Sequence, residues 1–264
     1  MLIDAHTHLD MYGDDLDAAL REIREHRILT FTNSMDPASW ERNVEIGQAC
    51  ELVVPCFGIH PWNAAGYVDR LAGLREPIER CPVLGEIGLD HYFIEDASVY
   101  PAQQQVFEHF LAAAREQGKL VNLHTKGAER EVFDLLRRHR IERAIVHWYS
   151  GPLDVLADLI STGAYFTVGA ELLDSEHIRA VARMVPLERL LSETDNPGGS
   201  RSLGGRPRMP LVVRDVVNAL ADVRGVTHED MVRTVHDNFR GLIAGDPWLS
   251  DTYSAFFAEP MLGG

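Results

Sequence analysis

The sequence predicts an α/β fold, and within that class a closed (β/α)8 TIM barrel. A length of 264 residues suits one such barrel. Short runs rich in apolar and β-branched residues alternate with segments of helical periodicity, which is typical of repeated βα units around a parallel sheet. An open parallel sheet built from the same units is the alternative.

Eight runs are predicted as strands because each is short, apolar and rich in β-branched residues. In chain order they lie at residues 2–6, 28–34, 52–59, 82–87, 119–124, 143–148, 164–169 and 189–194. Between them, apolar residues recur three and four positions apart, as expected of helices that bury one face. The clearest examples are Leu16, Leu20 and Ile23, then Val106, Phe110 and Leu111, and later Val132, Leu135 and Leu136.

Residues 1–264 are predicted to form a single domain, with a core over 1–244 and a tail over 245–264. The tail carries four aromatic residues, which are unfavourable in water and should therefore be buried. They are Trp248, Tyr253, Phe256 and Phe257. We expect the tail to pack on the barrel's own helices. The alternative is that it contacts a protein partner.

The charge balance narrows the function classes, because 40 Asp and Glu residues outnumber 25 Lys and Arg residues and the net charge is −15. This excludes loose adhesion to nucleic acid, so any phosphate must be recognised locally. No apolar stretch approaches the roughly 18 residues of a membrane span. A strand is predicted almost from the first residue, which leaves no room for a signal peptide, and we expect a cytoplasmic protein. Cys50, Cys56 and Cys81 are expected to be reduced core residues.

Two histidines, His6 and His8, lie one residue apart at the end of the first predicted strand. Alternate side chains of a strand share a face, so both imidazoles can reach a single metal ion. A barrel also puts its chemistry at the strand ends. Taken alone, a His-x-His pair is as often incidental as functional.

Four later strands each carry a metal-capable side chain at or near the C-terminal end. These are Glu86, His124, His147 and Asp195. Side chains far apart in sequence can therefore converge on one rim of the barrel. Each also has an ordinary structural interpretation: a histidine hydrogen-bonded in the core, a glutamate in a solvated turn, an aspartate that caps the next element.

Six motifs in this order resemble the TatD family of metal-dependent deoxyribonucleases, a branch of the amidohydrolase-like barrels. They are DAHTHLD at 4–10, GIHP at 58–61, GEIGLD at 85–90, HT at 124–125, His147 with SG at 150–151, and ETDNP at 193–197. The DNF at 237–239 is also similar to the family. The motifs span about three quarters of the chain, and their combination is far more specific than any one of them.

The resemblance implies a metal-dependent hydrolase barrel with two divalent cations, either Mg, Mn or Zn. It implies that His6, His8 and Asp195 hold one ion and that His124 and His147 hold the second. Glu86 would bridge both. Asp195 is also the expected base that takes the proton from the attacking water. The resemblance does not make His60 a ligand, and we expect it near the scissile phosphate as a hydrogen-bond donor.

Two departures from the family pattern bear on the substrate. Many relatives read His-x-Arg-Asp where this chain has HTKG at 124–127, so Lys126 replaces a bidentate arginine with a point charge. The common His-Cys-Phe becomes HWY at 147–149, where Trp148 either stacks on a base or packs against the barrel wall.

A Gly/Pro/Arg-rich loop over 196–209 adds three candidate phosphate contacts, with a solvated lid as the alternative. They are Arg201, Arg206 and Arg208.

The expected activity is hydrolysis of DNA phosphodiester bonds, with nucleotides removed from an end. The first alternative is hydrolysis of a carbonyl substrate, such as a small amide or ester or an aminoacyl-tRNA ester, because the same activated water attacks carbonyl carbon. The second is a subunit of a larger nucleic-acid-processing complex that docks through the tail. Against a non-catalytic subunit stands the complete set of candidate ligands.

Overall fold

The computed structural model describes residues 1–199, 209–250 and 253. Eight strands in this part of the chain form one parallel sheet whose spatial order follows the sequence. They are β1 (Leu2–Thr7), β2 (Ile28–Asn33), β3 (Val53–Phe57), β4 (Val83–Gly88), β5 (Leu120–His124), β6 (Ala144–Val146), β7 (Tyr165–Val168) and β8 (Leu190–Ser192). Each overlaps one predicted strand.

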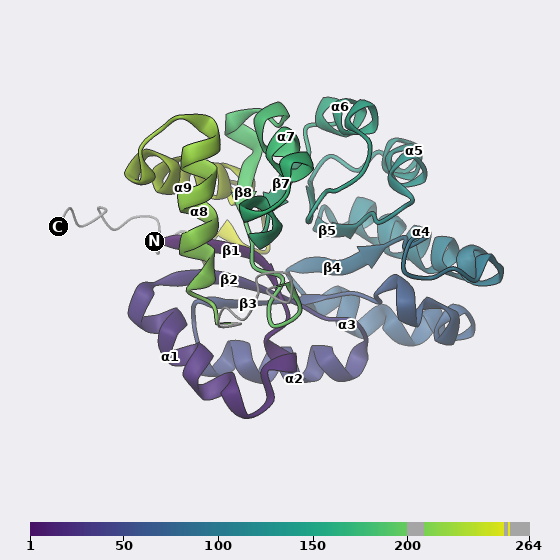
Figure 1. Ribbon diagram of the computed structural model, residues 1–264. Coiled ribbons are helices and arrows are strands. Elements are labelled where there is room, and N and C mark those ends of the chain that lie inside the picture. The colour runs from purple at the N-terminus through teal and green to yellow at the C-terminus, as the bar shows by residue number, and fades with distance from the viewer. Residues whose placement is uncertain (200–208, 251–252, 254–264) are drawn as a thin grey trace.

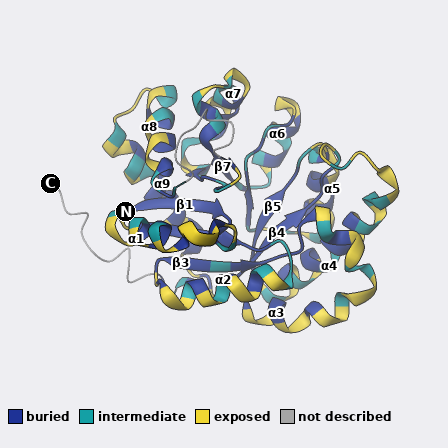
Figure 2. Ribbon diagram, turned by 60° about the horizontal axis from the view of Figure 1, so that its bottom comes forward, coloured by how far each residue is buried: buried dark blue, intermediate teal, exposed yellow. Residues whose placement is uncertain are grey.

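Helices surround the sheet (Figure 1). They are α1 (Leu16–His26), α2 (Pro37–Ala49), α3 (Arg75–Arg80), α4 (Tyr100–Gln117), α5 (Glu129–His139), α6 (Leu153–Ser161), α7 (Glu176–Met184), α8 (Val212–Arg224) and α9 (His228–Ile243). In Figure 2 the strands are buried and the helices expose their outer faces. The apolar residues predicted from helical periodicity in α1, α4 and α5 are all buried.

The last strand returns beside the first and nearly closes the barrel. The Asp195 backbone N–H donates to the His6 carbonyl at 2.9 Å, and Ser192 Oγ donates to the Ile3 carbonyl at 2.6 Å. Each bond joins residues that lie 189 positions apart in the sequence. The prediction of a (β/α)8 barrel is therefore confirmed.

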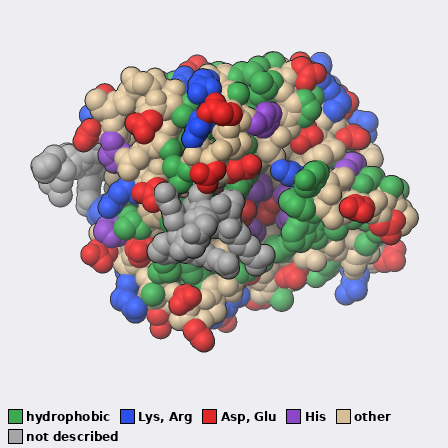
Figure 3. Space-filling model, in the orientation of Figure 1, with side chains coloured by type: hydrophobic (Ala, Val, Ile, Leu, Met, Phe, Trp, Pro, Cys, Tyr) green, Lys and Arg blue, Asp and Glu red, His purple; other side chains and the backbone are tan. Residues whose placement is uncertain are grey.

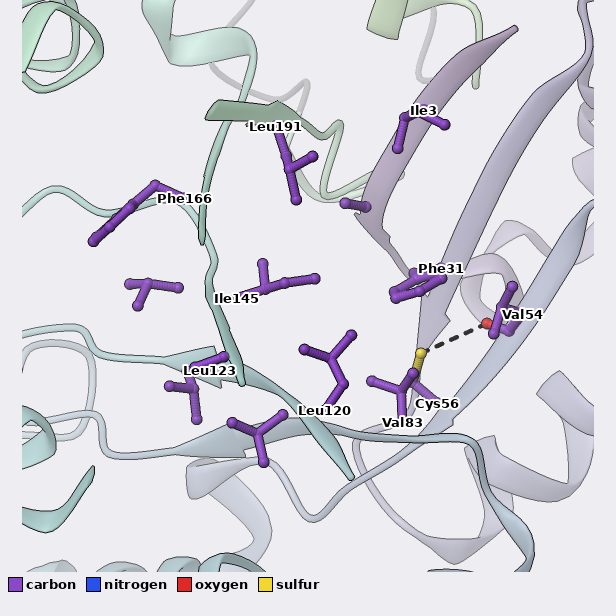
Figure 4. Packing of buried hydrophobic residues seen from close by; sticks show 14 of the residues in the cluster. Ile3, Phe31, Val54, Cys56, Val83, Leu120, Leu123, Ile145, Phe166 and Leu191 are labelled. Carbon is purple, nitrogen blue, oxygen red and sulfur yellow. Dashed lines mark hydrogen bonds between the residues drawn. The ribbon is translucent and has the colours of Figure 1, made fainter. Parts of the chain in front are cut away.

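Apolar side chains of the strands fill the space between the sheet and the helices. Other apolar side chains fill the inside of the barrel, where Leu120, Ile145 and Leu191 point toward one another (Figure 4). All three cysteines are buried and none forms a disulfide, as expected. This hydrophobic core holds the strands in position, and with them the side chains at the strand ends.

The pairing register shifts in two places, both beside candidate ligands. Between β1 and β2 it shifts after Asp4, and between β4 and β5 it shifts after Leu84. Such irregularities re-aim side chains near a strand end. Two glycines next to Glu86 permit the close strand approach there, because a Cβ at Gly58 would overlap the Glu86 backbone and one at Gly88, where φ is +147°, would overlap His124.

The described part of the tail packs on the barrel. The ring of Trp248 lies 3.9 Å from Lys119 Nζ, and its Nε1 donates to the Gln117 carbonyl at 3.3 Å. Tyr253 is buried. These contacts agree with the expected intramolecular packing for these two aromatics, whereas Phe256 and Phe257 lie outside the described residues. Contact with a protein partner and the division at residue 244 stay predictions.

Over residues 1–199 and 209–250, none of the helices combines the length and the apolar character needed to cross a bilayer.

Candidate metal centre

The six predicted ligands come together at the carboxyl ends of the strands, with Glu86 of β4 in their midst. Glu86 Oε2 lies 3.3 Å from both His6 Nε2 and His8 Nε2 of the β1 end. Glu86 Oε1 lies 2.7 Å from His124 Nδ1 and 3.0 Å from His147 Nε2. One carboxylate thus faces two histidine pairs, one with each oxygen.

Asp195 follows β8 and completes the side of the site formed by β1. Its Oδ1 lies 3.3 Å from His8 Nε2 and 3.8 Å from His6 Nε2. Asp195 has a φ of 51° and Trp148, beside His147, has a φ of 37°. Such angles are uncommon for non-glycine residues and often occur where side chains are held for function.

The donor set fits a divalent cation. Within the described residues, three groups of side chains bring possible ligand atoms within 4.8 Å of one another; they are His6, Glu86 and His147; His6, His8 and Asp195; and His60, Glu86 and His124. His6 Nε2 is buried and makes no hydrogen bond, although it points at these carboxylates. A buried imidazole nitrogen without a hydrogen bond is what a metal ligand would leave when the ion is removed.

The β1 histidines are oriented by neutral groups. His6 Nδ1 lies 3.0 Å from Asn122 Oδ1, and His8 Nδ1 lies 2.9 Å from the Asn33 carbonyl. These oxygens accept, so each Nδ1 carries a hydrogen, and in a neutral ring the lone pair therefore lies on Nε2. Both Nε2 atoms face Glu86, in the orientation required of ligands.

The histidines at the ends of β5 and β6 face carboxylates instead. His124 Nε2 lies 3.0 Å from Asp90 Oδ2, and His147 Nδ1 lies 3.4 Å from Glu193 Oε2. Glu193 is fully buried and also accepts a 2.5 Å hydrogen bond from Thr167 Oγ1. Sequence reasoning missed both acids as functional residues, although each stands inside a recognised motif. The signal was an acid that follows or ends a predicted strand beside a candidate ligand.

Burial and charge oppose each other on the two candidate carboxylate ligands. Burial alone would raise the pKa of Glu86, but the surrounding histidines hold that pKa well below its usual value. Burial would likewise raise the pKa of Asp195, but the hydrogen bond and charge of His8 lower it. Both side chains are therefore anionic at neutral pH.

The imidazoles respond in the opposite sense. Burial alone would lower the pKa of His147, but the carboxylates of Glu86 and Glu193 raise it well above its usual value. Burial would also lower the pKa of His8, which Asp195 and Glu86 raise. Without a cation, protons on these histidines thus offset the negative charge of the carboxylates. A cation can replace those protons.

His60 lies beside Glu86 but is suited to donate a hydrogen bond. Its Nδ1 accepts from the Trp62 backbone N–H at 3.2 Å, so its Nε2 carries the hydrogen. Nε2 lies 3.3 Å from Glu86 Oε1. Burial lowers the pKa of His60 to about 4, which keeps the ring neutral. The hydrogen on Nε2 favours the predicted donor over a ligand.

A cavity of about 410 Å³ opens onto the candidate metal centre. Its lining includes three candidate ligands, His124, His147 and Asp195, together with Lys126 and Trp148. Lys126 Nζ donates to a serine hydroxyl, Ser150 Oγ, at 2.6 Å, and Trp148 Nε1 donates to Glu171 Oε2 at 2.6 Å. The hollow and its purple histidines are visible in Figure 3.

The predicted substrate-binding residues divide into two sets. Lys126 and Trp148 both line the cavity. Trp148 is also packed close to Gly169 and Gly199, so its indole is part of the wall as well as of the cavity surface. Arg201, Arg206 and Arg208 lie outside the described residues, and their role stays a prediction.

Comparison with known proteins agrees with this arrangement. The chain is 30% identical over 258 residues to an uncharacterized metal-dependent hydrolase, YcfH of Escherichia coli, and the match covers 91% of this chain and 95% of YcfH. It is 35% identical over 148 residues to the 3'-5' ssDNA/RNA exonuclease TatD of Edwardsiella piscicida, which covers 53% of this chain and 56% of that protein.

Among solved structures, the fold is similar to YJJV, a TATD homolog from Escherichia coli. The TM-score is 0.82 at 24% identity, and the match covers 91% of this chain and 97% of YJJV. The family model of the TatD related DNases matches residues 3–244. With this match and the shared barrel, the chain belongs to the TatD family of metal-dependent hydrolases.

Proposed function

We propose that this protein is a metal-dependent deoxyribonuclease that hydrolyses phosphodiester bonds of DNA and removes nucleotides from an end. The observation that carries the proposal is the shared carboxylate of Glu86, whose two oxygens face two separate histidine pairs. That pattern is typical of a two-metal site. The nuclease name of the Edwardsiella relative supports a phosphodiester substrate.

In this proposal His6, His8 and Asp195 hold one divalent cation, and His124 and His147 hold a second. Glu86 belongs to both. Two such cations, whether Mg, Mn or Zn, would lower the pKa of an attacking water and offset charge on the phosphoryl oxygens.

The remaining steps fall to the protein's own side chains. Asp195, which lines the cavity and is anionic at neutral pH, accepts the proton of the attacking water. His60 donates through Nε2 toward the phosphate. Lys126, which lines the cavity, pairs with a phosphate oxygen as a point charge. Each role assigns one proton or one charge to one named atom.

A turnover panel tests the proposal. Chelated protein is reloaded with Mg, Mn or Zn and incubated with oligonucleotides labelled at the 5' or the 3' end, single-stranded and double-stranded. We expect metal-dependent loss of single nucleotides from one end. Carbonyl esters, amides and an aminoacyl-tRNA are included because the same centre could attack carbonyl carbon. Turnover of those substrates with intact oligonucleotides would overturn the proposal in favour of carbonyl chemistry.

A further inference from the structure

Three large aromatic side chains form an exposed surface beside the metal centre, which we call the aromatic shelf. Trp62, Tyr92 and Phe93 are 49%, 64% and 57% exposed. Phe93 packs edge-on against both neighbours, with ring centroids 5.9 Å from Trp62 and 5.0 Å from Tyr92. The other large exposed apolar residues of the described chain are scattered over different elements, so this grouping is unlike the rest of the surface.

The backbone of the shelf is held in place by one buried carboxylate. Asp90 Oδ1 accepts from the backbone N–H of Tyr92 at 3.0 Å and of Phe93 at 2.7 Å. Asp90 Oδ2 accepts from Trp62 Nε1 at 2.7 Å and lies 3.0 Å from His124 Nε2. The carboxylate that orients a candidate metal ligand thus also orients the shelf, and the two are fixed relative to each other.

The shelf is continuous with the cavity. Tyr92 and Phe93 line the cavity together with His124 and Lys126. Lys126 Nζ lies 5.3 Å from the Tyr92 ring centroid and 5.9 Å from that of Phe93, within the range of a cation–π contact. In Figure 3, hydrophobic side chains and a basic group stand at the edge of the hollow that holds the histidines. A ligand in this cavity meets planar apolar rings and one positive charge.

We propose that the aromatic shelf stacks an unpaired base of a single-stranded nucleic acid whose adjacent phosphodiester lies at the metal centre. This inference rests on the proposed function and adds the side chains that hold the base. Aromatic rings accept the face of any base, so stacking tolerates sequence. A base inside a duplex has both faces covered by its neighbours and cannot use the shelf. The Lys126 charge beside the rings suits the phosphate that accompanies each base.

The test measures binding to matched oligonucleotides on the metal-loaded protein. A fluorescein-labelled oligothymidylate with cleavage-resistant phosphorothioate linkages is compared with the same backbone lacking every base, and with a duplex. The readout is the ratio of the two dissociation constants, abasic over base-bearing. This ratio isolates the bases because both single strands carry the same phosphates. Base stacking is worth 1–3 kcal/mol, so we expect a ratio of roughly ten for the unaltered protein.

The variants remove the rings of Tyr92 and Phe93, because these two residues bond to Asp90 only through their backbones. Tyr92→Ala with Phe93→Ala should lower the ratio toward one, whereas Tyr92→Phe should keep it. Trp62 is left intact because it bonds to Asp90. Met184→Ala is the matched control, since Met184 is an exposed apolar residue at the end of α7. Circular dichroism and metal content confirm that each variant is folded and loaded.

The outcomes separate this inference from the proposed function. An unchanged ratio in the double alanine variant, or equal weakening of both ligands, would overturn the shelf while DNA cleavage stands. If the unaltered protein neither binds nor cleaves any oligonucleotide with any metal, the proposed function falls and the shelf proposal falls with it. A shelf that instead mediates self-association, detected as a dimer lost in the double variant with an unchanged ratio, also overturns it.

Discussion

The two sides of the metal centre offer similar ligands but support them differently. On the side formed by the β1 end and Asp195, the outer nitrogens of His6 and His8 meet a neutral amide and a backbone carbonyl. On the side formed by β5 and β6, those of His124 and His147 meet carboxylates. We call these the β1 half and the β5 half. Glu86 belongs to both.

The difference predicts unequal affinity for cations. A carboxylate behind an imidazole raises the basicity of its coordinating nitrogen and adds negative charge near the ion. The β5 half should therefore bind its cation more tightly than the β1 half, in which Asp195 must also serve as a base. A firmly held ion and a more exchangeable one would then share Glu86.

Glu86→Gln should abolish the difference between the halves, because it removes the ligand they share. We expect turnover of the oligonucleotide substrate to fall by roughly 10³-fold or more, with both cations lost and the fold retained. Activity is measured on the labelled oligonucleotide and metal content by mass spectrometry. Glu51→Gln, at an exposed turn, is the control. Unchanged activity with unchanged metal content would refute the two-metal assignment.

Asp195→Asn should affect the β1 half alone. The amide neither accepts the proton of water nor supplies a negative ligand, so we expect kcat to fall by roughly 10²–10³-fold. One equivalent of metal should remain bound, in the β5 half. Asp69→Asn on the exposed surface is the control. Loss of both ions in equilibrium dialysis would show that the halves do not bind independently.

Asp90→Asn and Glu193→Gln should weaken the β5 half without touching a ligand. Each replaces the anion behind a histidine with a neutral amide, and such changes reduce metal affinity by about 10–100-fold. Calorimetric titration of the chelated protein with metal should show two binding events. The dissociation constant of the tighter event should rise toward that of the weaker event. If the weaker event shifts instead, the assignment of the halves is reversed.

Removing the metal should reverse the dependence of stability on pH. In the metal-free protein the pKa values of His8, His124 and His147 are raised, chiefly by their carboxylate neighbours acting against burial. That stabilisation is fully present below the unfolded value of about 6.5. It is lost as the pH rises through the raised folded values. The lowered pKa of Glu86 and of Asp195 adds stability that is lost only as the pH falls toward acid.

We therefore expect the melting temperature of chelated protein to fall by about 5 °C between pH 6 and pH 9. Metal-loaded protein should not show this fall, because cations compete with protons for the same nitrogens and bind better as the pH rises. Differential scanning calorimetry at matched ionic strength measures both curves. Parallel curves for the two forms would contradict the proton occupancy inferred for the site.

The sequence alone determined the barrel and the positions from which its chemistry would come. Parallel strands are buried on both faces, so they appear as short apolar runs, and a polar residue at the end of such a run stands out. His6, His124 and Glu86 were found in this way. A barrel places the carboxyl ends of all its strands on one rim. The fold class alone therefore predicts that residues distant in sequence lie close together there.

The tertiary structure alone decided how those side chains are supported. The contact of His124 with Asp90 crosses 34 residues, and the hydrogen bond from Thr194 to Asp4 crosses 190. No local pattern encodes such pairs, because they depend on strand register and on which neighbour faces the ring. The exposure of Tyr92 and Phe93 is also decided by the folded structure. The local sequence of a loop does not show whether its aromatic side chains are buried or open to a cavity. Local periodicity therefore fixes the elements, whereas tautomers, pKa values and open surfaces arise only when the elements meet.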